Sequence, residues 1–281
     1  MLLSLIIPVY KVEEYIEECI ESVCSQLREG IEVIMINDGT PDQSMIMAKS
    51  YINKNYKSLI DQFVFIDQKN KGQSVARNNA LEIAKGEYIA FLDSDDRLND
   101  NFFDEIIDKI ILHRPDVINL NAKAFGDENK TIKFVSDFYI GLFTEEIKKN
   151  IFEKNMWMPW LHIFRKKIMA DFKFPLVYAY EDMISIPFLY FNVSKIVRLE
   201  DELILYRVRD SSLSNNIKDE NINSLDYAIN LFEVTKDSSL DILLNHCYKM
   251  KFKFLCRKKG VFYAFHWIRS IKTKRLGDFF S

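Results

Sequence analysis

The chain has 281 residues, of which 48% are hydrophobic and 28% are charged, a composition typical of a globular protein. This length suffices for one large domain, or for one domain and an appendage. The formal net charge of −3 argues against a protein that binds nucleic acid over much of its surface.

Strand and helix patterns alternate through the first half of the chain. Continuous apolar runs predict buried strands, and apolar residues at helical spacing between them predict amphipathic helices. The expected strands are 3–10, 31–38, 63–68, 87–94 and 116–125. The expected helices are 12–27, 41–56, 72–86 and 99–114. This order predicts a mostly parallel, doubly wound, Rossmann-like α/β sheet flanked by helices.

The pattern changes after about residue 126. The elements expected next are short strands within 131–143, a tryptophan-rich stretch at 156–164, a helix near 180–191 and one or two strands at 195–209. From residue 216 onwards the pattern is helical to the end. We therefore expect a main domain at 1–215 and a helical C-terminal extension at 216–281, rich in basic and aromatic residues.

The cysteines indicate a reducing compartment. None of them has CxxC or zinc-ligand spacing, and the chain shows no signal-peptide pattern, so we expect reduced, buried thiols in a cytoplasmic protein. The four cysteines are Cys19, Cys24, Cys247 and Cys256. No apolar run reaches the roughly eighteen residues of a membrane-spanning helix.

Polar residues follow four of the expected strands at their carboxyl ends. These segments are Pro8-Val9-Tyr10, Asn37-Asp38-Gly39-Thr40, Asp67-Gln68-Lys69-Asn70 and Asp93-Ser94-Asp95-Asp96. Open α/β sheets bind ligands at this edge. One polar strand end would indicate only a surface turn, but four in succession predict a single lined crevice.

The spacing of Asp93 and Asp95 indicates a metal site. Residues two apart in an extended chain point to the same side, and two like charges there need a cation or a donor to offset them. Carboxylate oxygens suit Mg²⁺ or Mn²⁺ bound together with ligand phosphates. The chain has neither GxGxxG after the first strand nor GxxxxGK[ST], which argues against a dinucleotide enzyme and a P-loop NTPase. An ordinary turn is the alternative interpretation.

Four stretches of the sequence resemble the family 2 glycosyltransferases, which have the GT-A fold. They are SLIIPVYKVEEYIEECIESV, IEVIMINDGTPDQS, NKGQSVARNNALEIAKGEYIAFLDSDD and YEDM. The resemblance implies inverting transfer of a sugar from a nucleotide diphosphate sugar, with UDP expected, in the synthesis of bacterial surface glycans. It also implies a nucleotide-sugar-binding half at 1–97 and an acceptor-binding half at 98–215.

The resemblance implies roles for residues on the donor side. Tyr10 would stack on the base, and Asp38 would hydrogen-bond it. Asp93 would contact the ribose, and Asp95 would hold Mn²⁺ or Mg²⁺ on the diphosphate. The other expected donor-site residues are Pro8, Val9, Gly72, Arg77 and Ser94. Arg207 and Arg209 could clamp the diphosphate from a mobile loop or lie on a solvated strand edge.

On the acceptor side, the resemblance assigns Asp182 as the general base, with Glu181 beside it. A carboxylate can take the proton of the acceptor hydroxyl during the attack. Two acids would also suit the first turn of an ordinary helix. Trp160 and His162 are expected to border the acceptor, and core packing is an equally good interpretation of both.

The basic C-terminal segment suggests a contact with a membrane. Residues 249–281 hold ten Lys and Arg and one acid, whereas 28 basic and 40 acidic residues precede them. A basic segment with aromatic residues suits an anionic membrane surface. The alternative is docking on the acidic body of the protein. We expect a peripheral location on the inner face of the cytoplasmic membrane and a glycan or lipid-linked glycan as acceptor.

The favoured function is a glycosyltransferase that adds a sugar to a surface polysaccharide or lipo-oligosaccharide precursor. A sugar nucleotidyltransferase would need a Gly-rich, basic loop after the first strand, and PVYKVEEYIEE has none. A non-catalytic module that binds nucleotide or sugar is the third possibility. A nucleic-acid partner is not expected, because the body of the chain is acidic.

Overall fold

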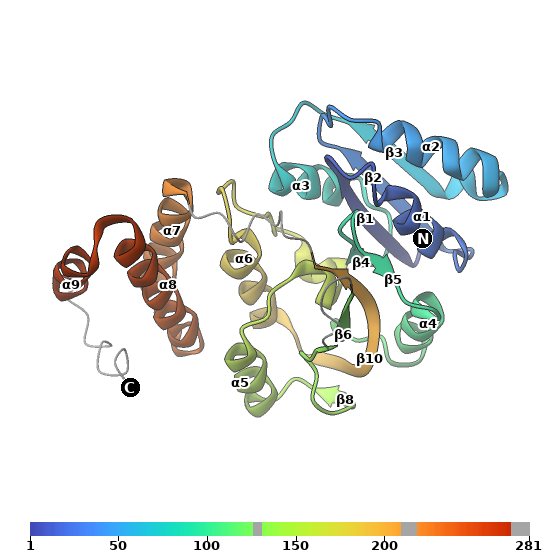
Figure 1. Cartoon of the computed structure of the whole chain (residues 1–281). Coiled ribbons are helices and arrows are strands. Elements are labelled where there is room, and N and C mark those ends of the chain that lie inside the picture. Colours follow the sequence, from blue (N-terminus) through green and yellow to red (C-terminus); the bar gives the residue numbers. More distant parts are fainter. Residues whose placement is uncertain (126–130, 209–217, 271–281) are drawn as a thin grey trace.

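Four parallel strands form the N-terminal part of the sheet, as the alternating pattern predicts. Figure 1 shows the computed structural model, which describes residues 1–125, 131–208 and 218–270. In spatial order the strands are β3 (Phe63–Asp67), β2 (Ile31–Asn37), β1 (Leu3–Val9) and β4 (Tyr88–Phe91). The helices between them are α1 (Ile16–Cys24), α2 (Ser44–Asn55) and α3 (Gln73–Ile83).

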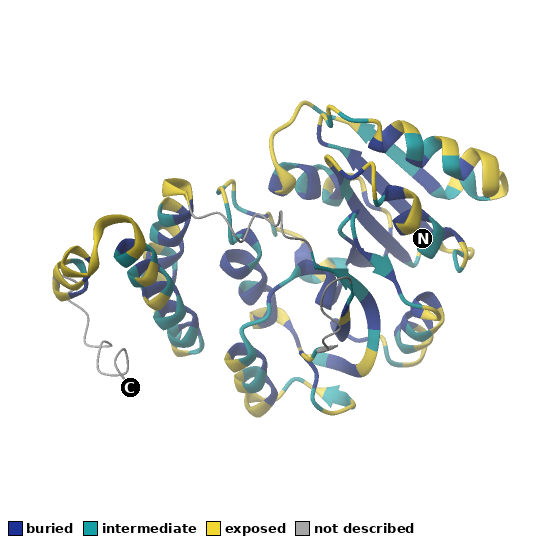
Figure 2. Cartoon of the chain, in the orientation of Figure 1, coloured by how far each residue is buried: buried dark blue, intermediate teal, exposed yellow. Residues whose placement is uncertain are grey.

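These strands are aligned so that their carboxyl ends meet at one edge. Val9 pairs with Asn37, and Asn37 pairs with Asp67. All residues of β1 except Pro8 are buried, which requires that both faces of the sheet are covered (Figure 2). This is why β1 and β2 are mostly apolar and do not alternate regularly with polar residues. Ser4 and Glu32, which interrupt them, are buried and joined by a hydrogen bond of 2.6 Å from Ser4 Oγ to Glu32 Oε1.

Beyond β4 the sheet contains strands of both directions. The second half contains β5 (Arg97–Leu98), β6 (Val117–Phe125), β7 (Thr131–Ile132), β8 (Tyr139–Leu142), β9 (His162–Arg165) and β10 (Lys195–Arg207). The path continues β4-β9-β6-β10-β5, with β7 on β6 and β8 on β10. β9 is antiparallel to both of its neighbours, and β10 is parallel to β6.

The predicted fold class is confirmed, but the sheet is more mixed than the pattern suggests. Sequence analysis did not identify β9, because its four residues, His162–Arg165, are too few to show a periodicity. This short strand separates β6 from β4, so the fifth expected strand does not extend the parallel run directly. The segment 195–209, expected as one or two strands, forms the single strand β10, with register shifts between Arg198 and Ile204.

Six helices accompany the second half of the described chain. They are α4 (Phe102–His113), α5 (Glu145–Lys154), α6 (Glu181–Leu189), α7 (Asp219–Thr235), α8 (Asp241–Lys259) and α9 (Val261–Ser270). Short 3-10 helices lie at Lys57–Gln62, Pro159–Leu161, Lys166–Met169, Tyr190–Asn192 and Ser238–Leu240. The ring centroids of Phe188 in α6 and Phe232 in α7 are 6.1 Å apart, so the C-terminal helices pack on α6 (Figure 1). The expected domain boundary at 215–216 lies outside the described residues.

All four cysteines are free thiols, and three of them are buried. Burial raises the pKa of Cys24 to about 12 and that of Cys247 to about 12. Both thiols therefore stay protonated at neutral pH, as expected of structural cysteines. None of the helices in the described ranges is long and apolar enough to cross a membrane.

Candidate active site

The polar strand ends meet at one edge of the sheet, as their order in the sequence predicts. Asn37 Nδ2 donates to Asp67 Oδ1 at 2.8 Å, which joins the ends of β2 and β3. The backbone N–H of Thr40 donates to Asn37 Oδ1 at 2.9 Å, and that of Lys11 donates to Thr40 Oγ1 at 2.8 Å. The loops after β1, β2 and β3 therefore form one connected wall.

Asp38 holds the loop that leads from β3 into α3. Its Oδ1 accepts hydrogen bonds from Gln68 Nε2 at 2.7 Å and from the backbone N–H of Lys71 at 2.8 Å. Its Oδ2 accepts from the backbone N–H of Gly72 at 2.9 Å. Gly72 lies at the N-cap of α3 with φ of 88°, a conformation that glycine adopts without strain. Asp38 is only 4% exposed, and its contact with a base stays a prediction.

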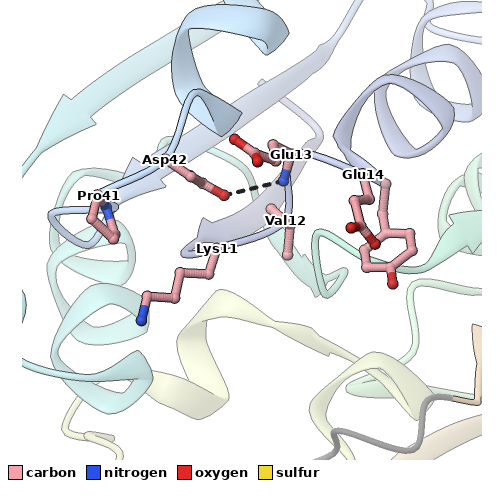
Figure 3. Close-up of a pocket in the computed structure, with 7 residues that line it drawn as sticks. Lys11, Val12, Glu13, Glu14, Pro41 and Asp42 are labelled. Atoms are coloured by element: carbon pink, nitrogen blue, oxygen red, sulfur yellow. Dashed lines mark hydrogen bonds between the residues drawn. The ribbon is translucent and has the colours of Figure 1, made fainter.

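Tyr10 is the most exposed residue of the expected base-binding segment. It is 40% exposed, whereas Val9 is fully buried and Pro8 half-buried. Beside it, a pocket of about 380 Å³ opens between the loops after β1 and β2 (Figure 3). The lining residues are Lys11, Val12, Glu13, Glu14, Tyr15, Pro41 and Asp42. Lys11 Nζ lies 5.3 Å from the Tyr10 ring centroid, so this ring has a cation on its face.

A buried arginine connects the end of β4 to the start of α6. Arg77, in α3, is 2% exposed, and its Nη2 donates to Asp93 Oδ1 at 2.9 Å. Its Nη1 donates to Glu181 Oε1 at 2.9 Å, and Gln73 Nε2 donates to the same oxygen at 2.5 Å. Burial alone lowers the pKa of Arg77, but the carboxylates of Asp93 and Glu181 outweigh this effect and raise it. The guanidinium thus stays charged and orders both carboxylates.

Asp182 follows Glu181 in the first turn of α6, and its carboxyl group binds a proton more tightly than an ordinary aspartate does. It is half-buried, and its Oδ1 accepts a hydrogen bond from the backbone N–H of Met183 at 2.7 Å. Burial raises the pKa of Asp182 to about 7, and the negative charge of Glu181 adds to the rise. The Met183 hydrogen bond and Arg77 oppose it. A carboxyl group that titrates near neutral pH is suited to general base catalysis.

The carboxylates after β4 alternate between the surface and the interior. Asp93 and Asp95 are half-buried, whereas Ser94 and Asp96 are 5% and 1% exposed. The segment is a turn and not an extended strand, because the backbone N–H of Asp96 donates to the carbonyl oxygen of Asp93 at 3.0 Å. The two-residue period of an extended chain therefore does not apply here. Asp96 Oδ1 accepts a hydrogen bond from the backbone N–H of Arg207 at 2.7 Å, so this buried carboxylate fixes residues 93–96 against the end of β10.

Asp93 and Asp95 fit one divalent cation only if a ligand completes the coordination. In the ranges described, no group of three or more His, Cys, Asp or Glu is placed to hold a metal ion. Mg²⁺ typically takes one or two carboxylates and fills its other positions with phosphate and water oxygens. The two half-buried carboxylates that follow β4 match that pattern. Metal binding by Asp95 stays a prediction.

Arg207 supports the candidate metal segment and does not lie on a solvated strand edge. Its Nε donates to the backbone carbonyl of Asp95 at 2.9 Å, and its Nη2 donates to Glu18 Oε2 at 2.8 Å. The guanidinium also lies 4.7 Å from the Tyr15 ring centroid and 4.5 Å from that of Phe125. Arg207 therefore holds the backbone of residue 95, and its contact with a diphosphate stays a prediction. Arg209 lies outside the residues that the structure describes.

Trp160 and His162, expected to border the acceptor, lie in the core. They are 3% and 1% exposed. His162 Nδ1 is 2.8 Å from the Tyr190 hydroxyl and 3.2 Å from Asn119 Nδ2, and burial lowers the pKa of His162 to about 3. The Trp160 ring stacks on Tyr206 at 5.5 Å. These contacts support the core-packing interpretation, because neither side chain presents a surface to an acceptor.

Sequence analysis missed Gln68 and Gln73, which hold Asp38 and Glu181. Neither glutamine belongs to a motif that would single it out. The only signal for Gln68 was its place at a polar strand end, and the only signal for Gln73 was its place in the stretch NKGQSVARNN that carries the family resemblance. Both roles depend on partners that are distant in the chain.

The mixed sheet and its flanking helices define a protein with the GT-A fold. Residues 1–349 of TarS from S. aureus, solved in complex with UDP-GlcNAc, align with a TM-score of 0.70 and 22% identity. The alignment covers 99% of this chain and 80% of that chain. At this identity the similarity establishes the fold, a mixed α/β sheet flanked by helices.

The sequence profile described as glycosyl transferase family 2 matches residues 4–173, more than half of the chain. The chain belongs to this family. Glycosyltransferase GlyA of Streptococcus pneumoniae is 27% identical over 222 residues, which cover 75% of this chain and 31% of GlyA. Minor teichoic acid biosynthesis protein GgaB of Bacillus subtilis is 35% identical over 130 residues, 46% of this chain and 14% of GgaB. The chain thus spans only part of the length of these relatives.

Proposed function

We propose that this chain transfers a sugar, with inversion, from a UDP-sugar to a hydroxyl group of a surface glycan or its lipid-linked precursor. One observation carries the proposal. Asp182, whose pKa is about 7, follows Glu181 in the chain, and Arg77 pairs with both Glu181 and Asp93. These contacts support a position of the candidate base beside the proposed donor site. Family membership supports the transferase activity. The similarity to TarS, solved with UDP-GlcNAc, supports a UDP-sugar, and the similarity to GgaB supports a surface-glycan acceptor.

The donor would lie along the carboxyl ends of β1, β2 and β4. The exposed ring of Tyr10 offers a face for the base, and Asp93 offers a carboxylate to the ribose. Asp95 would hold a divalent cation, which neutralises the charge of the departing diphosphate when bound. The remaining residues proposed to shape the donor site are Pro8, Val9, Asp38, Gly72, Arg77 and Ser94.

The acceptor hydroxyl would meet Asp182. As the hydroxyl oxygen forms its bond to the anomeric carbon, the bond from that carbon to the diphosphate breaks, and the Asp182 carboxylate takes the hydroxyl proton. Attack from the face opposite the leaving group inverts the anomeric carbon. Glu181 is 4% exposed and stays bound to Arg77, so its role is to raise the proton affinity of Asp182 and not to contact the acceptor directly.

Calorimetric titration of UDP, with Mn²⁺ and with EDTA, tests the donor site in wild type and in Asp95→Ala. We expect binding that requires the metal and is lost in the variant. Asp108→Ala, which removes an exposed carboxylate of α4, is the matched control and should bind like wild type. Equal binding with EDTA and in Asp95→Ala would refute the metal role.

Release of UDP from a panel of UDP-sugars, with and without glycan acceptors, tests the chemistry. Turnover that requires an acceptor and is lost in Asp182→Asn supports the transferase. Tight UDP binding without turnover on any acceptor would favour a non-catalytic binding module. Binding of GDP or dTDP, but not of UDP, would show that the donor carries a different base from the one proposed.

A further inference from the structure

The corner at which α8 meets α9 exposes an unusual group of apolar side chains. This α8–α9 corner comprises residues 257–265, and Phe262 at its tip is 94% exposed. Val261, Tyr263 and Phe265 are 53%, 47% and 39% exposed. Single exposed apolar residues are common on soluble proteins, but several contiguous ones mark an interaction surface.

Phe265 packs edge-on against Phe252 in α8, with ring centroids 5.3 Å apart, so the outward apolar tip consists of Val261, Phe262 and Tyr263. The opposite face of α9 packs inward through Ala264 and Ile268, which are 0% and 3% exposed. Trp267 lies 6.2 Å, between ring centroids, from Tyr248 in α8 and adds to this packing. Figure 2 shows α9 at the end of the molecule farthest from the N-terminal strands, with an exposed outer surface. The apolar tip is therefore free to meet a partner without disturbing the fold.

Basic residues lie directly beside the apolar tip. Arg257, Lys258 and Lys259 form the last turn of α8, and all three residues are exposed. Lys259 Nζ lies 4.9 Å from the Tyr263 ring centroid, so a charge and an aromatic face are already adjacent. Lys258 pairs with Asp219 at 2.7 Å and is the least available of the three.

The basic and aromatic side chains of the α8–α9 corner favour an anionic lipid surface over a second copy of the chain as the partner. Two copies of this chain that met corner to corner would bring like charges together, which is unfavourable. An anionic lipid surface neutralises the charges, and its interface accommodates aromatic rings. We propose that the α8–α9 corner docks on the anionic headgroups of a phospholipid bilayer, with Phe262 and Tyr263 inserted at the headgroup level. This inference does not depend on the proposed sugar transfer, because lipid binding needs neither donor nor acceptor.

Co-sedimentation of the full chain with vesicles tests the proposal. The two vesicle types are phosphatidylcholine alone and equal amounts of phosphatidylcholine and phosphatidylglycerol. We expect binding to the anionic vesicles that weakens with salt, and little binding to the neutral ones. Phe262→Ser/Tyr263→Ser and Arg257→Gln/Lys259→Gln should each weaken binding by about tenfold or more.

A matched control separates a docking site from general charge attraction. Lys54→Gln/Lys173→Gln removes two exposed lysines at other places and should bind anionic vesicles like wild type. Equal loss in this control, equal binding to both vesicle types, or no binding by the wild-type chain would overturn the proposal. Sedimentation showing a dimer that Phe262→Ser dissociates would also overturn it and would identify a second copy as the partner. Circular dichroism spectra and thermal midpoints that match wild type show that all variants are folded.

Discussion

The raised pKa of Asp182 makes the stability of the protein depend on pH in a specific way. The pKa rises from 3.8 to about 7, mainly because burial disfavours the charged form and secondly because Glu181 is negative. Between these two values the folded state keeps a proton that the unfolded state has lost. The stabilisation is therefore complete below about pH 4 and is lost as the pH rises through about 7. A rise of about three pKa units at ~1.4 kcal/mol per unit sets an upper limit of about 4 kcal/mol for the cost of ionised Asp182 at pH 8. Asp182 is only half-buried, so solvent screening reduces this cost to on the order of 2–4 kcal/mol.

Asp182→Asn removes the charge and keeps an oxygen that can accept the hydrogen bond from Met183. We expect the variant to match wild type at pH 4 and to be more stable at pH 8, with a free energy of unfolding higher by about 2–4 kcal/mol. Urea unfolding followed by circular dichroism at pH 4, 6 and 8 measures this difference. Glu181→Gln is the companion variant, since without the neighbouring charge the pKa of Asp182 should fall.

A difference between Asp182→Asn and wild type that stays constant from pH 4 to pH 8 would refute this reasoning. It would show that the carboxyl group of Asp182 titrates alike in the folded and unfolded states. The site would then lack a base tuned to neutral pH, and the general-base role would lose its physical support.

Three further predictions concern activity and the supports of the site. The rate of sugar transfer should fall below about pH 7, because Asp182 gains a proton there. Asp182→Asn should lower kcat about a hundredfold or more and leave UDP binding intact. An assay of UDP release measures kcat, and calorimetry measures UDP binding. Arg77→Met leaves Asp93 and Glu181 without their buried cation and should cost about 3–5 kcal/mol in urea unfolding, so a loss under 1 kcal/mol would contradict the positioning role. Gly72→Ala should cost ~1 kcal/mol because its φ of 88° strains any side chain, although the added Cβ meets nothing within 4 Å; an unchanged thermal midpoint would count against this.

The local pattern of the sequence was sufficient to predict much of the fold. The alternation of apolar runs with amphipathic segments located β1 to β4 and the helices between them. The polar residues after those strands located the edge of the sheet at which the loops after β1, β2 and β3 join. These features depend on periods of two and about 3.6 residues, which the backbone imposes wherever the chain is extended or helical.

Other features depended on contacts between distant segments, which no local pattern records. Arg77 and Glu181 are 104 positions apart, and only the packing of α3 against α6 brings them together. The core positions of Trp160 and His162 follow from the insertion of β9 between β4 and β6. The exposure of Phe262 follows from the way α9 folds back on α8. The sequence by itself determined which segments are strands or helices and which strand ends are polar, because local periodicity encodes both. The tertiary structure alone decided that Asp93 and Glu181 both pair with the guanidinium of Arg77, and it alone decided which aromatic residues are exposed. Burial and charge pairing are properties of the assembled fold.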